Sequence, residues 1–98
     1  MTRYGLSPRA QPDLAEIWDY TAERWGAEQA AAYIRRIETS VEAAATEPKS
    51  GTACDHIRAG YRKLRSGSHV LFYQIGEDGI EVRRILHQRM DFGPHLPS

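Results

Sequence analysis

Cysteine is almost missing from this sequence of 98 residues, in which Cys54 is the single example. A lone cysteine excludes an internal disulfide and cannot hold zinc by itself, so we interpret Cys54 as a bystander thiol rather than a nucleophile. Long apolar runs are missing too, since no stretch approaches the roughly eighteen residues of a membrane-spanning helix. The N-terminus lacks the basic and then apolar segments of a secretion signal, and we therefore expect a cytoplasmic protein with no membrane partner.

The motifs that accompany most cofactors are absent as well. The sequence has no glycine-rich phosphate loop, no nucleophile elbow and no metal-ligand spacing. A lone histidine on a strand is more often a structural residue than a ligand, and the four histidines are scattered: His56, His69, His87 and His95. We expect no cofactor and no metal.

Charge is balanced overall but uneven along the chain. Residues 1–50 carry six basic and eight acidic side chains, whereas residues 51–98 carry seven basic and five acidic ones. The window 56–75 contains four basic residues and no acid: Arg58, Arg62, Lys63 and Arg65. This local bias suits an acidic protein surface or a nucleic-acid backbone, while the overall neutrality argues against a dedicated DNA-binding protein.

A short strand at residues 3–7 is expected to lead into an amphipathic helix. Ser7 and Pro8 predict an N-cap and a first helical position, unless Pro12 shifts the regular start towards Gln11. The helical spacing of apolar residues predicts the face turned to the core: Leu14, Ile17, Trp18, Thr21, Ala22 and Trp25. Four acids lie off this stripe and predict a solvated acidic face: Asp13, Glu16, Asp19 and Glu23.

A second helix is expected to return antiparallel to the first. Gly26 predicts a left-handed cap between the two. The second apolar stripe comprises Ala30, Tyr33, Ile34, Ile37, Val41 and Ala44. So short a link requires a helical hairpin, and helical aromatics usually pack inside, so we place Trp18, Trp25 and Tyr33 in the core. Residues 47–51 break the helix, and a loop is expected at 52–60.

Three meander strands complete the predicted order, at 61–66, at 69–75 and from Gly79 onwards. The last two are apolar on both faces, which is typical of central strands. The apolar residues of the last strand change phase at Arg83 and Arg84, and such a slip can mark a bulge. The tail at 92–98 holds prolines and is expected to be loosely held.

The sequence therefore predicts one α+β domain over residues 1–98, in the order β-α-α-β-β-β. A helical hairpin would pack on one face of a small, mostly antiparallel sheet, leaving the other face partly exposed. Basic residues from neighbouring strands would then meet on one surface: Arg58, Arg62, Lys63, Arg65, Arg83, Arg84, His87 and Arg89. An arginine-rich binding or RNA-cleaving face and ordinary solvated strand edges explain this spacing about equally well.

Six segments resemble ParE toxins, namely residues 6–10, 17–20, 24–26, 57–62, 67–70 and 85–91. The likeness follows nearly the whole chain in order, and its closing HQRMD run, preceded by GYR and GSH, is specific. Pro12 stands where relatives usually carry another residue. The resemblance implies the fold of the ParE/RelE toxin superfamily and the toxin half of a type II toxin–antitoxin pair. It further implies a non-enzymatic poison of DNA gyrase, neutralised by a ParD-like antitoxin through which alone the toxin reaches operator DNA.

We expect one set of residues to contribute to the surfaces for antitoxin or gyrase: Tyr61, Arg62, Arg65, Arg84, His87, Gln88, Arg89 and Met90. The alternative is a RelE-like enzyme that cuts mRNA on the ribosome, with His87 as general acid and arginines stabilising the phosphate. The ending at 92–98 lacks the tyrosines or lysines expected of that branch, which favours the non-catalytic poison. A third interpretation is an inactive relative kept for antitoxin binding or autoregulation.

Overall fold

The computed structural model describes residues 3–96. The elements are β1 (Tyr4–Leu6), α1 (Ala10–Trp25), α2 (Ala27–Thr46), η1 (Pro48–Ser50), β2 (Thr52–Ala53), β3 (Arg62–Ser66), β4 (His69–Ile75), β5 (Ile80–His87) and η2 (Gly93–His95). The sheet order is β1-β5-β4-β3-β2, with β1 parallel to β5 and the other pairs antiparallel. The predicted α+β architecture is confirmed, and the two-residue strand β2 is an addition within the expected loop.

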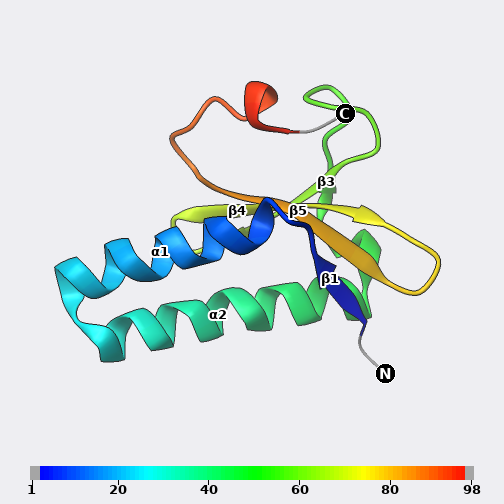
Figure 1. Ribbon diagram of the computed structural model, residues 1–98. Helices are drawn as coiled ribbons and strands as arrows, with labels where there is room; N and C mark the ends of the chain where they lie inside the picture. The colour runs from blue at the N-terminus through cyan, green and yellow to red at the C-terminus, as the bar shows by residue number, and fades with distance from the viewer. Residues whose placement is uncertain (1–2, 97–98) are drawn as a thin grey trace.

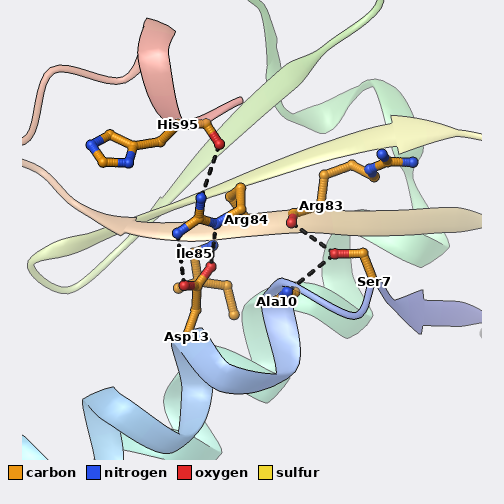
Figure 2. Close-up of polar contacts among 7 residues, drawn as sticks. All are labelled: Ser7, Ala10, Asp13, Arg83, Arg84, Ile85 and His95. Carbon is orange, nitrogen blue, oxygen red and sulfur yellow. Dashed lines mark hydrogen bonds and ion pairs between the residues drawn. The ribbon is translucent and has the colours of Figure 1, made fainter. Parts of the chain in front are cut away.

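The side chain of Ser7 caps the turn from which α1 starts. Its Oγ accepts the N–H of Ala10 at 3.1 Å and donates to the carbonyl of Arg83 at 2.8 Å, which ties the cap to β5 (Figure 2). Pro12 is the third residue of α1 and lies in the first turn, where N–H groups have no intrahelical partner anyway.

Gly26 alone separates the two helices. Its φ of 93° lies in the region that favours glycine, but its ψ of 163° is extended, so the left-handed cap predicted here is wrong in detail. The chain still reverses at once, and α1 packs along α2 on one side of the sheet (Figure 1).

Strand β5 contains a bulge at Arg83. Arg84 lies opposite Phe72 and Val82 lies opposite Tyr73, which leaves Arg83 as the extra residue. The predicted phase slip is confirmed. Its consequence is that Val82 and Ile85 both belong to the core under the helices.

A second core covers the opposite face of the sheet, where we expected exposure. It contains Cys54, Tyr61, Val70, Phe72, Leu86 and Leu96. The expectation was wrong because the loop before β3 and the tail both fold over this face (Figure 1). The tail is therefore packed as far as it is described: Phe92 lies 4.8 Å from Phe72 between ring centroids, and Leu96 is buried. Residues 97 and 98 of the predicted loose tail lie outside the described residues.

Cys54 is fully enclosed in this second core. Burial raises the pKa of its thiol, which is the opposite of what a nucleophilic cysteine needs.

Candidate functional site

A hollow runs between α1 and the adjoining ends of β4 and β5. It consists of two cavities of about 360 Å³ and 660 Å³ that share Tyr20, His69 and His87 in their walls. We call this hollow the α1 groove. The first cavity is completed by Asp13, Glu16, Ile17, Arg84, Ile85, Leu86 and Met90, and the second by Thr21, Trp25, Gln29, Tyr33 and Ser68.

Large apolar side chains stand exposed around the groove. Trp25 is 69% exposed, Tyr20 59% and Met90 37%. The prediction that Trp18 and Trp25 are core residues is wrong, because α1 buries a narrow stripe that includes Ile17 and leaves both indoles outside. Exposed aromatic and methionine side chains beside a hollow are typical of a protein-binding surface.

Three rings meet on the floor of the groove. The Tyr33 hydroxyl lies 2.6 Å from His69 Nδ1 and accepts the N–H of Ser68 at 3.0 Å. The rings of His69 and His87 make an edge-to-face contact at 5.3 Å, and His87 Nδ1 accepts the N–H of Arg89 at 3.2 Å. Burial, and then the neighbouring His87, lower the pKa of His69. His69 is therefore neutral at neutral pH.

The sequence interpretation treated these two histidines as scattered and missed the cluster. The register of the β4–β5 hairpin places His69 directly opposite His87, and both point to the same face. Counting back from the Asp78-Gly79 turn gives the wrong pairing unless the bulge at Arg83 is included. Trp25 was missed for a different reason, since its helical spacing resembles that of a core residue, and Tyr20 lies off the predicted apolar stripe and was not considered as a site residue.

Arg84, expected on a partner surface, is instead buried. Its Nε and Nη2 donate to the Asp13 carboxylate at 2.7 Å and 3.0 Å, and its Nη1 donates to the carbonyl of His95 at 3.0 Å (Figure 2). Hydrogen bonding to Asp13 raises the pKa of Arg84 and keeps it charged. Asp13 also accepts the N–H of Ile85, so this acid does not belong to the predicted solvated face.

The remaining predicted site residues divide into two groups. Tyr61 is buried in the second core, and Arg62 donates to the carbonyls of Gly51 and Lys49, so both hold the fold together. Arg65 is exposed on β3, away from the groove lining. His87 and Met90 line the groove, and the exposed Gln88 and Arg89 lie between them in sequence.

The basic residues therefore do not share one face. Arg62 lies opposite Tyr73 and Arg84 lies opposite Phe72, and these neighbouring positions of β4 point to opposite sides of the sheet. Among residues 3–96 there is no group of three side chains able to hold a metal ion, and no helix there is long and apolar enough to cross a membrane.

This chain is similar to known proteins in sequence and in fold. Residues 4–92 match the family described as "ParE toxin of type II toxin-antitoxin system, parDE". Toxin ParE1 of Mycobacterium tuberculosis is 54% identical over 96 residues, which is 97% of this chain and 98% of the relative. Toxin ParE1 of Caulobacter vibrioides is 47% identical over 96 residues, covering 98% and 99% of the two chains.

A solved structure titled "Chromosomal ParDE TA system from P. aeruginosa" superposes with a TM-score of 0.77 at 20% identity. The match covers 89% of this chain and 96% of the other, and it supports the fold.

Proposed function

The chain belongs to the ParE toxin family of type II toxin–antitoxin systems, and from this premise we propose that it inhibits DNA gyrase and is neutralised by a ParD-like antitoxin. It acts by binding rather than by catalysis. The observation that carries the proposal is the α1 groove, with Tyr20 and Trp25 exposed beside it.

The antitoxin is proposed to bind in this groove. A segment that folds on contact can lay an apolar face into a hollow of this kind and cover exposed aromatic side chains. Tyr20, Trp25 and Met90 provide such contacts over both cavities. Aromatic anchors next to a concave surface supply most of the binding energy in many protein interfaces.

The gyrase contact is proposed to involve the residues that follow β5. Gln88 and Arg89 are exposed, and His87 and Met90 on either side of them line the groove. An antitoxin segment in the groove would therefore cover or crowd this run. Neutralisation then needs no conformational change, because one bound segment blocks the surface that gyrase requires.

The electrostatics of the groove favour binding over RNA cleavage. A phosphoryl transition state needs cations that are free to stabilise it. Of the arginines in the described chain, Arg84 lines the groove, and its guanidinium already binds Asp13 and the carbonyl of His95. Glu16 lines the same cavity and would repel a phosphate.

The test is a supercoiling assay with purified gyrase that also detects linear, cleaved DNA. We expect inhibition with trapped cleavage complexes, reversed by the antitoxin. Arg89→Ala should weaken inhibition, whereas Arg35→Ala, which removes an exposed arginine from α2, is the matched control and should not.

Gyrase activity that is unchanged at all toxin concentrations would refute the proposal. A ribosome-dependent mRNA cleavage assay then decides the alternative. RNA cleavage that disappears in His87→Ala would make the protein an enzyme.

A further inference from the structure

Two ring nitrogens in the α1 groove have no hydrogen-bond partner within residues 3–96. They are Nε2 of His69 and Nε2 of His87, since the polar contacts of both rings are made at Nδ1. Among residues 3–96, the side-chain polar atoms that are both fully buried and without a partner are Arg58 Nε and Arg83 Nε, and neither histidine Nε2 is one of them. Both Nε2 atoms therefore reach solvent, and both side chains line the groove.

The contact at Nδ1 determines where the ring of His87 carries its proton. The N–H of Arg89 donates to His87 Nδ1 at 3.2 Å. A neutral imidazole whose Nδ1 accepts a hydrogen bond has its proton on Nε2. His87 thus presents an N–H donor to the groove. The contacts of His69 do not fix its tautomer, because the Tyr33 hydroxyl that lies 2.6 Å from its Nδ1 also donates to the carbonyl of Ser66 at 3.4 Å.

The surroundings of His87 and of the neighbouring His69 are largely apolar, with one free acid. The titratable and charged groups that the packed elements and the following segment bring to them are Glu16 and Tyr20 of α1, Tyr33 of α2, the closed Asp13–Arg84 pair and Arg89. Glu16 would repel a second carboxylate brought into this cavity, whereas a neutral oxygen meets no such penalty. Burial already disfavours the charged form of His69.

We propose that the antitoxin segment in the α1 groove places a neutral oxygen acceptor, from a backbone carbonyl or a side-chain amide, within hydrogen-bond distance of the Nε2–H group of His87. This rests on the antitoxin binding proposed above and names the chemistry that the partner must bring. The apolar side chains of the segment cover Tyr20 and Trp25 at the same time. A donor covered by an apolar group without an acceptor is costly, so His87 selects the segment and its register.

Low pH is expected to weaken the proposed binding of the antitoxin. Protonation of His69, which burial already disfavours, places a positive charge beside the ring of His87, whose centroid is 5.3 Å away, and beneath the apolar side chains of the bound segment. The affinity therefore falls as the pH drops through the usual histidine range. A carboxylate acceptor would give the opposite sign, because it would stabilise the protonated ring.

The experiment measures the Kd of the full-length ParD-like antitoxin, used as the probe, between pH 7.5 and 5.5. His87→Gln retains an N–H close to the position of Nε2, and His87→Leu removes it while keeping an apolar side chain. We expect His87→Gln to bind within about twofold of wild type and His87→Leu about 5- to 30-fold more weakly, because the buried acceptor of the antitoxin loses its donor. Wild-type affinity should fall by up to about tenfold over these two pH units, because the pKa of His69 lies below the usual value.

The outcomes separate this inference from the function on which it rests. An antitoxin that binds at no pH overturns the proposed function. Binding that His87→Leu leaves intact overturns the role of His87 as donor and leaves the proposed function standing, and affinity that rises in acid shows a carboxylate acceptor instead. If His87→Leu fails to fold, the pH series on wild type and on His87→Gln still decides between these results.

Discussion

Asp13 and Arg84 form a buried, two-point ion pair between α1 and β5, although 71 positions separate them in the sequence. Each residue is 7% exposed. Strand β1, which pairs with β5, ends at Leu6. Further along β5, the Asp13 carboxylate accepts the backbone N–H of Ile85. Arg84 also donates a hydrogen bond to the carbonyl of His95 in the tail. One pair thus joins the helix, the sheet and the tail.

Replacing Asp13 by alanine should lower the free energy of unfolding by about 3–5 kcal/mol, the usual cost of leaving one charge of a buried pair unpaired. The guanidinium of Arg84 and the N–H of Ile85 would both lose their acceptor. Urea unfolding followed by circular dichroism measures the effect.

The control for this prediction is the exposed pair between Arg83 and Glu81, 3.0 Å apart, in which the Glu81 side chain is 51% exposed. Glu81→Ala should change stability by less than about 1 kcal/mol. Equal unfolding midpoints for Asp13→Ala and wild type would show that the buried pair does not stabilise the fold.

Gly67→Ala should destabilise the protein by about 1–3 kcal/mol and disturb the histidine cluster. Gly67 has a φ of 61°, and an added Cβ would lie 2.7 Å from the Tyr33 ring. Since the Tyr33 hydroxyl binds His69, displacement of the ring should also shift the imidazole NMR signals of His69.

Gly5→Ala is the matched control, because nothing lies within 4 Å of a Cβ there. It should stay within about 0.5 kcal/mol of wild type. Unaltered His69 signals in Gly67→Ala would mean that Tyr33 does not depend on this glycine.

We expect the protein to lose stability in mild acid because of His69. Its folded-state pKa lies below the unfolded value of 6.5, so the unfolded chain binds the proton first. This destabilisation by proton uptake at His69 is absent above about pH 7. The free energy of unfolding decreases as the pH falls below about 6.5, by at most ~1.4 kcal/mol per pH unit.

The urea midpoint of wild type at pH 7.5, 6.5 and 5.5 measures this dependence. His69→Asn keeps an acceptor near Nδ1 for the Tyr33 hydroxyl but cannot titrate, and its profile should be flatter. A His69→Asn profile as steep as that of wild type would assign the acid sensitivity to other groups.

Local patterns predicted the elements well, because capping, turns and periodicity are short-range. The phase slip at Arg83 is an example. The helix start is less well predicted: Ser7 caps the preceding turn, but α1 itself begins at Ala10, nearer Gln11, and Pro8 is not its first residue. Asp13 was misplaced because its position on α1 resembles that of its acidic neighbours, and only a partner 71 positions away distinguishes it.

The candidate site was harder to predict, since it depends on long-range packing. Trp25 has the spacing of a core residue, but the end of α1 extends beyond the sheet, and the indole ring is left exposed to solvent. The pairing of His69 with His87 depends on the register across a hairpin that contains a bulge. The cover over the second sheet face comes from the loop before β3 and from a tail whose composition suggests a loose end.

Trp25→Ser should separate binding from stability. The ring is 69% exposed, so its removal should change the free energy of unfolding by less than about 1 kcal/mol. Trp25 lines the α1 groove, and as an aromatic anchor its loss should weaken antitoxin binding by about tenfold or more. Trp18→Ser is the matched control, because Trp18 is an exposed indole of the same helix but is not in the groove lining. Titration of both variants with the antitoxin tests the assignment: an equal loss of affinity would place the antitoxin on the outer face of α1 instead of in the groove.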